Sequence, residues 1–167
     1  MPDVDRCAGC GFEYDLGDAP RAGLYIISGA ADIAEILASG RNVQERPDPA
    51  TWSPVEYGCH VRDVLLVQRE RVLAALIMER PSFDPMNRDE RAEYDGYAEQ
   101  TPERVARQLH EAAYLFANVL AHFKPADWDR VLMYNYPKLF ERSLRWIAVH
   151  TVHEVGHHLL DVRRQLE

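Results

Sequence analysis

The chain has 167 residues and a formal net charge of −8, and 47% of its residues are hydrophobic. This length suits one domain that buries a core without disulfides, and the composition excludes wholesale disorder. No run of Lys and Arg interrupts the acidic balance and no apolar stretch approaches the ~18 residues of a spanning helix, which argues against nucleic-acid and membrane partners.

Residues 1–18 are a polar, glycine-containing lead-in without the apolar core of a secretory signal, so we expect a reducing cytosol. They include Cys7-Ala8-Gly9-Cys10-Gly11, and C-x-x-C followed by glycine is typical of one knuckle of a zinc ribbon. Because Cys59 is the only other cysteine, a structural zinc on Cys7 and Cys10 would need ligands from elsewhere or from a second chain. The alternative is a flexible dithiol that oxidises.

Four amphipathic segments follow, at about 20–39, 53–79, 101–123 and 141–166. The second has the clearest start, because Ser53 can cap the helix, Pro54 suits its first position and Glu56 completes a capping box. A long polar crossover, 81–100, separates the second segment from the third, and strand signals are weak apart from Val131 to Tyr136. The pattern predicts an all-α chain with a lead-in (1–18) and a four-helix bundle domain (19–167).

The fourth segment contains His153-Glu154-Val155-Gly156-His157-His158, which begins with the H-E-x-x-H signature of zinc peptidases. Spacing permits two i, i+4 pairs, Glu154 with His158 or His153 with His157. The apolar stripe of this helix favours Glu154 and His158, which border the core, whereas His153 and His157 lie away from its centre. The second pair stays open as the alternative register.

A third ligand is needed for a firm site, and His60 is the best candidate because it is in phase with the interior face of the second segment. His110 and His122 are expected to be exposed. A peptidase is disfavoured because nine residues follow His158, which leaves no room for a distant third ligand or a Met-turn.

Two motifs together resemble the DinB-like superfamily over roughly residues 20 to 165. They comprise Trp52, Ser53, Glu56 and His60 in the second segment, with His150, Glu154, His157, His158 and Asp161 in the fourth. The resemblance implies an up-down-down-up bundle that holds a divalent metal on His60, Glu154 and His158. Many members have histidine in place of Glu154, and mycothiol-dependent maleylpyruvate isomerases look like the variant with glutamate.

The resemblance implies an enzyme that depends on a low-molecular-weight thiol, either an S-transferase or an isomerase, with small thiols and electrophiles as partners. Zn²⁺ is the expected cofactor, with Ni, Mn and Fe as other candidates, and a homodimer is expected by the same resemblance. His157, or else His153, is the nearest candidate proton acceptor, and His150 and Asp161 are expected to orient the ligands. A metal-dependent hydrolase using bound water, or a non-catalytic binding or stress-response module, remains the alternative.

Overall fold

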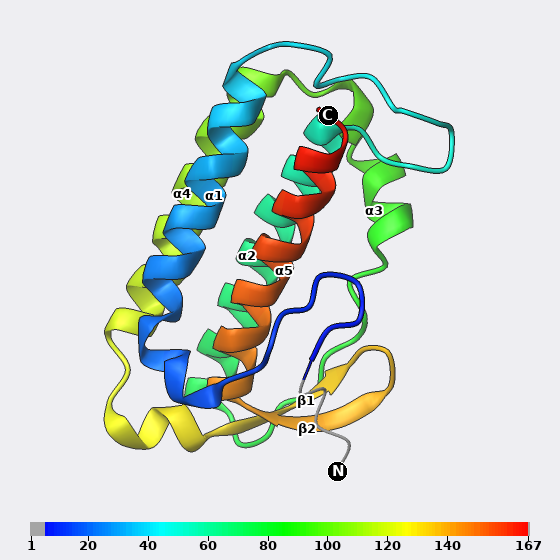
Figure 1. Cartoon of the computed structure of the whole chain (residues 1–167). Coiled ribbons are helices and arrows are strands. Elements are labelled where there is room, and N and C mark those ends of the chain that lie inside the picture. Colours follow the sequence, from blue (N-terminus) through cyan, green and yellow to red (C-terminus); the bar gives the residue numbers. More distant parts are fainter. Residues whose placement is uncertain (1–5, 167) are drawn as a thin grey trace.

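Four long helices dominate the computed structural model, which describes residues 6–166 (Figure 1). They are α1 (Ala22–Ala38), α2 (Pro54–Ile77), α4 (Pro102–Ala121) and α5 (Leu144–Arg164). The shorter elements are η1 (Leu16–Arg21), α3 (Arg88–Tyr94), η2 (Tyr97–Glu99), η3 (Pro125–Asp129), β1 (Val131–Asn135) and β2 (Leu139–Ser143). None of the helices in this described part combines the length and apolar character needed to cross a membrane.

The long helices form a bundle in which α1 and α2 each pack against both α4 and α5. In Figure 1 the chain runs upward along α1 and α5 and downward along α2 and α4. The interface between α2 and α5 therefore joins two segments that are far apart in the sequence. It contains the side chains that the sequence singles out for metal binding.

The predicted capping box at the start of α2 is confirmed. The Glu56 amide donates to Ser53 Oγ at 3.3 Å, and the Ser53 amide donates to Glu56 Oε2 at 2.8 Å. Arg46 Nε also donates to Glu56 Oε2 at 2.8 Å, so the buried carboxylate is paired. Because His60 follows Glu56 by one helical turn, this start fixes the height at which His60 enters the bundle.

The crossover between α2 and α4 is held against α2 by a buried polar network. Arg62 donates to Gln100 Oε1 at 2.7 Å and to Asp95 Oδ2 at 3.0 Å. The Tyr97 hydroxyl donates to Asp63 Oδ2 at 2.6 Å, and Tyr97 itself is fully buried. The segment that the sequence presents as a polar crossover is therefore a packed element.

The expectation of a purely helical chain is wrong in one region, where β1 and β2 form an antiparallel hairpin. In this pairing Val131 lies opposite Ser143, at the end of β2. The fourth helix begins at Leu144 and not near Glu141, because Glu141 belongs to β2 and Ser143 caps the helix by accepting from the Trp146 amide at 3.2 Å. Only β1 left a signal in the sequence.

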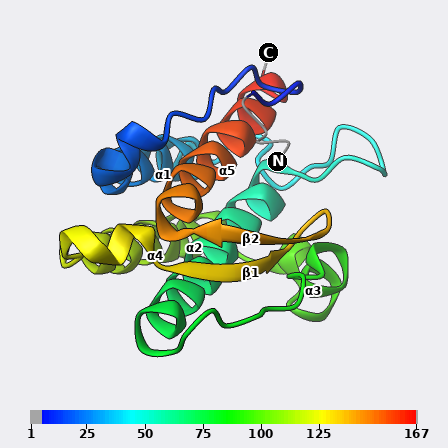
Figure 2. The ribbon, with the colours of Figure 1, turned by 90° about the horizontal axis from the view of Figure 1, so that it is seen from below.

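Residues 6–15 of the lead-in lie along α5, as Figures 1 and 2 show in dark blue. Phe12 contacts His153, with ring centroids 5.4 Å apart, and Tyr14 stacks on Trp146 at 6.0 Å. These contacts place the C-x-x-C loop over the histidine-rich face of α5. The division of the chain at residue 18 stays a prediction.

Candidate metal centre

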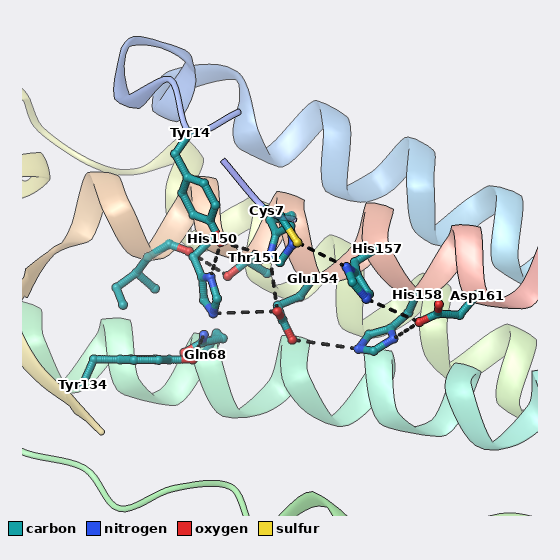
Figure 3. Close-up of polar contacts among 12 residues, drawn as sticks. Cys7, Tyr14, Gln68, Tyr134, His150, Thr151, Glu154, His157, His158 and Asp161 are labelled. Atoms are coloured by element: carbon teal, nitrogen blue, oxygen red, sulfur yellow. Dashed lines mark hydrogen bonds and ion pairs between the residues drawn. The ribbon is translucent and has the colours of Figure 1, made fainter. Parts of the chain in front are cut away.

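The helix α5 directs its two i, i+4 pairs at different neighbours. Glu154 and His158 point toward α2, while His157 lies near Cys7 of the lead-in (Figure 3). Consecutive helical residues are rotated by about 100° about the helix axis. The pair Glu154 and His158 and the pair His153 and His157 therefore lie on adjacent faces of α5.

We call His60, Glu154 and His158 the inner cluster. One donor atom from each lies within 4.8 Å of the others, and the rings of His60 and His158 are 4.9 Å apart. The distance from His158 Nε2 to Glu154 Oε2 is 4.0 Å. His60 and His158 are buried, with exposures of 4% and 6%, so the structure brings these residues together inside the protein.

The electrostatics of the inner cluster suit a cation. Burial, together with the nearby His158, lowers the pKa of His60 to about 3, which keeps its imidazole neutral. Burial raises the pKa of Glu154, but a hydrogen bond from His153 and the neighbouring imidazoles outweigh this, and the net pKa lies below its usual range. Moreover, His60 Nδ1 is buried without a hydrogen-bond partner. Two imidazoles and a carboxylate are a donor set that divalent zinc accepts.

Asp161 fixes the orientation of His158. Its Oδ2 accepts from His158 Nδ1 at 3.0 Å, which leaves Nε2 on the side of Glu154. Such a carboxylate–histidine pair sets the tautomer and raises the basicity of a ligand. The orienting role of Asp161 stays a prediction.

We predict that Asp161→Asn weakens metal binding by about 10–100-fold while the fold is retained, because the amide is neutral and orients the imidazole less firmly. Competition against a chelator of known affinity measures the effect. Asp32→Asn is the matched control, since Asp32 pairs with Arg163 on the surface and should leave the affinity unchanged. An unaltered affinity in Asp161→Asn would contradict the orienting role.

Aromatic side chains line the inner cluster on the α2 side. The ring of Trp52 lies 5.4 Å from that of His60, and Tyr57 stacks on His158 at 5.3 Å. From the crossover, Arg88 lies 5.3 Å above the Trp52 ring and Tyr97 contacts its edge at 6.1 Å. The crossover therefore covers this wall of the cluster.

We call Cys7, Cys10, His153 and His157 the outer cluster. Their donor atoms also lie within 4.8 Å of one another. His153 is 8% exposed although its phase places it away from the apolar centre, because the lead-in covers it. A sequence pattern that describes one helix at a time cannot reveal such a cover.

A third group, comprising His150, His153 and Glu154, is tied together by Tyr14, which sequence reasoning missed. The Tyr14 hydroxyl lies 2.9 Å from His150 Nδ1 and 3.0 Å from His153 Nδ1. Burial lowers the pKa of His150 to about 4, and His150 Nε2 lies 3.8 Å from Glu154 Oε1. These contacts link Tyr14 to the two imidazoles that lie beside Glu154.

His157, the expected proton acceptor, has a protein group near each ring nitrogen. Its Nδ1 lies 3.7 Å from Cys7 Sγ, and its Nε2 lies 3.7 Å from Asp161 Oδ2 (Figure 3). Asp161 thus contacts the imidazoles of both His157 and His158. The catalytic role of His157 stays a prediction.

Comparison with known proteins places this arrangement in a family. The model of the DinB superfamily matches residues 33–162, which include all three members of the inner cluster. The chain belongs to the DinB superfamily. The match confirms the resemblance seen in the paired motifs, and residues 6–15, with both cysteines of the outer cluster, lie outside it. A search of curated proteins gave no significant match.

Among solved structures, the DinB-superfamily chain is similar to YfiT from Bacillus subtilis. The TM-score is 0.74 at 14% sequence identity, and the alignment covers 92% of this chain and 90% of that chain. YfiT is described as a probable metal-dependent hydrolase with an unusual four-helix bundle topology. At this identity the likeness establishes a shared fold, and the chemistry must be argued from the residues present.

Proposed function

We propose that this DinB-superfamily protein is a divalent-metal-dependent enzyme whose inner cluster is the reaction centre. The observation that carries the proposal is the convergence of His60, Glu154 and His158, in which His60 Nδ1 is buried without a partner. Three protein ligands leave a coordination position open, as in catalytic zinc sites. The proposed ion is Zn²⁺, with Ni, Mn and Fe as other candidates.

The surrounding residues prepare the site for such an ion. Asp161 orients His158, and His153 and His150 hold the carboxylate of Glu154 in place. The rings of Trp52 and Tyr57 pack against His60 and His158 on the α2 side. The side chain of Glu154 is 23% exposed, so a small molecule would approach from its side. A bound ion would lower the pKa of a coordinated thiol or water and so make it a nucleophile at neutral pH.

The preferred reaction is transfer or isomerisation that depends on a low-molecular-weight thiol, with a small electrophile as the second partner. The DinB-like motif pair supports this choice, since mycothiol-dependent maleylpyruvate isomerases look like the variant with glutamate at the position of Glu154. Hydrolysis by bound water is the second candidate, and the printed description of YfiT supports it. We also propose a cytosolic homodimer, in line with the motif resemblance and the thiols of Cys7 and Cys10.

We predict that zinc-loaded protein supplied with mycothiol, bacillithiol or glutathione either transfers the thiol to a small electrophile or isomerises one such as maleylpyruvate, and that chelation stops the reaction. Thiol loss and product mass measure transfer, which uses up the thiol, whereas isomerisation regenerates the thiol and is measured by separating the substrate from its isomer. His158→Ala should reduce the rate to background, whereas His110→Ala, an exposed control on α4, should retain it. Metal-dependent hydrolysis without thiol would replace the first candidate with the second. Metal-loaded protein without either activity would overturn the enzyme proposal.

A further inference from the structure

The donor atoms of the outer cluster already have nearly the spacing of a four-coordinate site. In a tetrahedral zinc site with bonds of 2.0–2.3 Å, the ligand atoms lie roughly 3.3–3.8 Å from one another. Cys7 Sγ is 3.7 Å from His157 Nδ1, and all four donors lie within 4.8 Å of one another. Small rotations of the side chains would therefore close the site.

The backbone of the C-x-x-C loop has the tight turn that two thiolate ligands need. The Gly11 amide donates to the Cys7 carbonyl at 2.8 Å, and the Cys7 amide donates to the Phe12 carbonyl at 2.8 Å. Gly11 has a φ of 75°, in the left-handed region that favours glycine. A Cβ at Gly9 would approach His157 Cε1 to 3.1 Å, so glycine lets the loop sit against the imidazole.

Each histidine of the outer cluster has a protein oxygen near one ring nitrogen. His153 Nδ1 contacts the Tyr14 hydroxyl at 3.0 Å, while its Nε2 is buried without a hydrogen-bond partner. His157 Nε2 faces Asp161 at 3.7 Å, while its Nδ1 faces Cys7. Metal-binding histidines usually have this arrangement, in which the second nitrogen is anchored by a hydroxyl, carbonyl or carboxylate.

We propose that Cys7, Cys10, His153 and His157 form a second metal site, a closed Cys₂His₂ zinc site that fastens residues 6–15 to α5. Two thiolates and two imidazoles are the donor set of structural zinc sites, whereas three-ligand sites keep an open position. Both registers of the His153–His158 stretch then bind metal, one on each face of α5. Here His157 is a ligand, so it is not available as a proton acceptor.

The test is cobalt loading of the metal-free full-length protein, because cobalt bound to thiolate gives an intense charge-transfer band. We expect this band in the wild type and in His60→Ala, which lacks an inner-cluster ligand. The band should be absent from Cys7→Ser/Cys10→Ser. Elemental analysis should find about one zinc per chain less in that variant than in the wild type. Cys59→Ala, which removes a buried thiol on α2, should leave the band intact.

Two further measurements test the site if the double cysteine variant fails to fold. In the wild type, zinc should protect Cys7 and Cys10 from alkylation, and a chelator should restore the reaction. In His153→Gln/His157→Gln the cobalt band should disappear. A band that persists in that variant, equal zinc content with and without the cysteines, or a Cys7–Cys10 disulfide unaffected by zinc would each overturn the site without bearing on the inner cluster.

Discussion

His60→Ala is expected to weaken metal binding at the inner cluster by more than about 100-fold, because loss of an orienting partner alone costs 10–100-fold. The variant removes one of three ligands from a buried position. His158→Ala should have the same effect, since its imidazole pairs with Glu154 across the site. Metal-dependent turnover should fall to background in both variants.

The measurement is metal content after dialysis, carried out in a Cys7→Ser/Cys10→Ser background so that the outer cluster does not contribute. His110→Ala is the matched control, because it removes an exposed imidazole from the same fold. Full metal content in His60→Ala and His158→Ala would contradict the inner cluster. If Glu154→Ala retained its metal and His153→Ala lost it, the ion would be bound by ligands other than the inner cluster.

Tyr97→Ala is expected to lower the free energy of unfolding by about 3–5 kcal/mol, the usual cost of removing a large buried aromatic side chain. Tyr97 is fully buried, its hydroxyl bonds Asp63, and its ring contacts Trp52, which in turn packs on His60. The change should therefore also loosen the crossover over the inner cluster and weaken metal binding. Urea unfolding of the metal-free protein and a chelator titration measure the two effects.

Tyr94→Ala provides the matched control from the same segment, because Tyr94 is 90% exposed and its loss should change stability little. Tyr97→Phe separates the ring from the hydroxyl and should cost about 1–3 kcal/mol, since Asp63 loses a hydrogen bond. Equal stabilities of Tyr97→Ala and Tyr94→Ala would contradict the packed state of the crossover.

The positions of the long helices could be predicted from the sequence because their signals are local. The capping box of Ser53 and Glu56 marks the start of α2 with four consecutive residues. The position of His60 on the same helix face as neighbouring valines places it inside the bundle. The phase of α5 likewise favours Glu154 and His158 as the pair that borders the core. Periodicity is sufficient for these features because a helix face depends only on its own residues.

The remaining features depend on contacts between distant segments. The strand β2 forms through its pairing with β1. Its own sequence, which includes Glu141 and Arg142, has no alternating apolar pattern that would predict a strand. Tyr14 reaches His150 and His153 only because the lead-in returns along α5. The burial of His153 could not be predicted from the helix pattern, because the residues that cover it lie outside the helix.

The most direct measurement is an anomalous-difference map, recorded at the metal absorption edge, from crystals of the metal-loaded full-length protein. A peak between His60, Glu154 and His158, within the 2.0–2.2 Å bonding range of all three, is the predicted result. A loaded crystal without a peak there, or with the ion between His150, His153 and Glu154 instead, would contradict the inner cluster as the metal site.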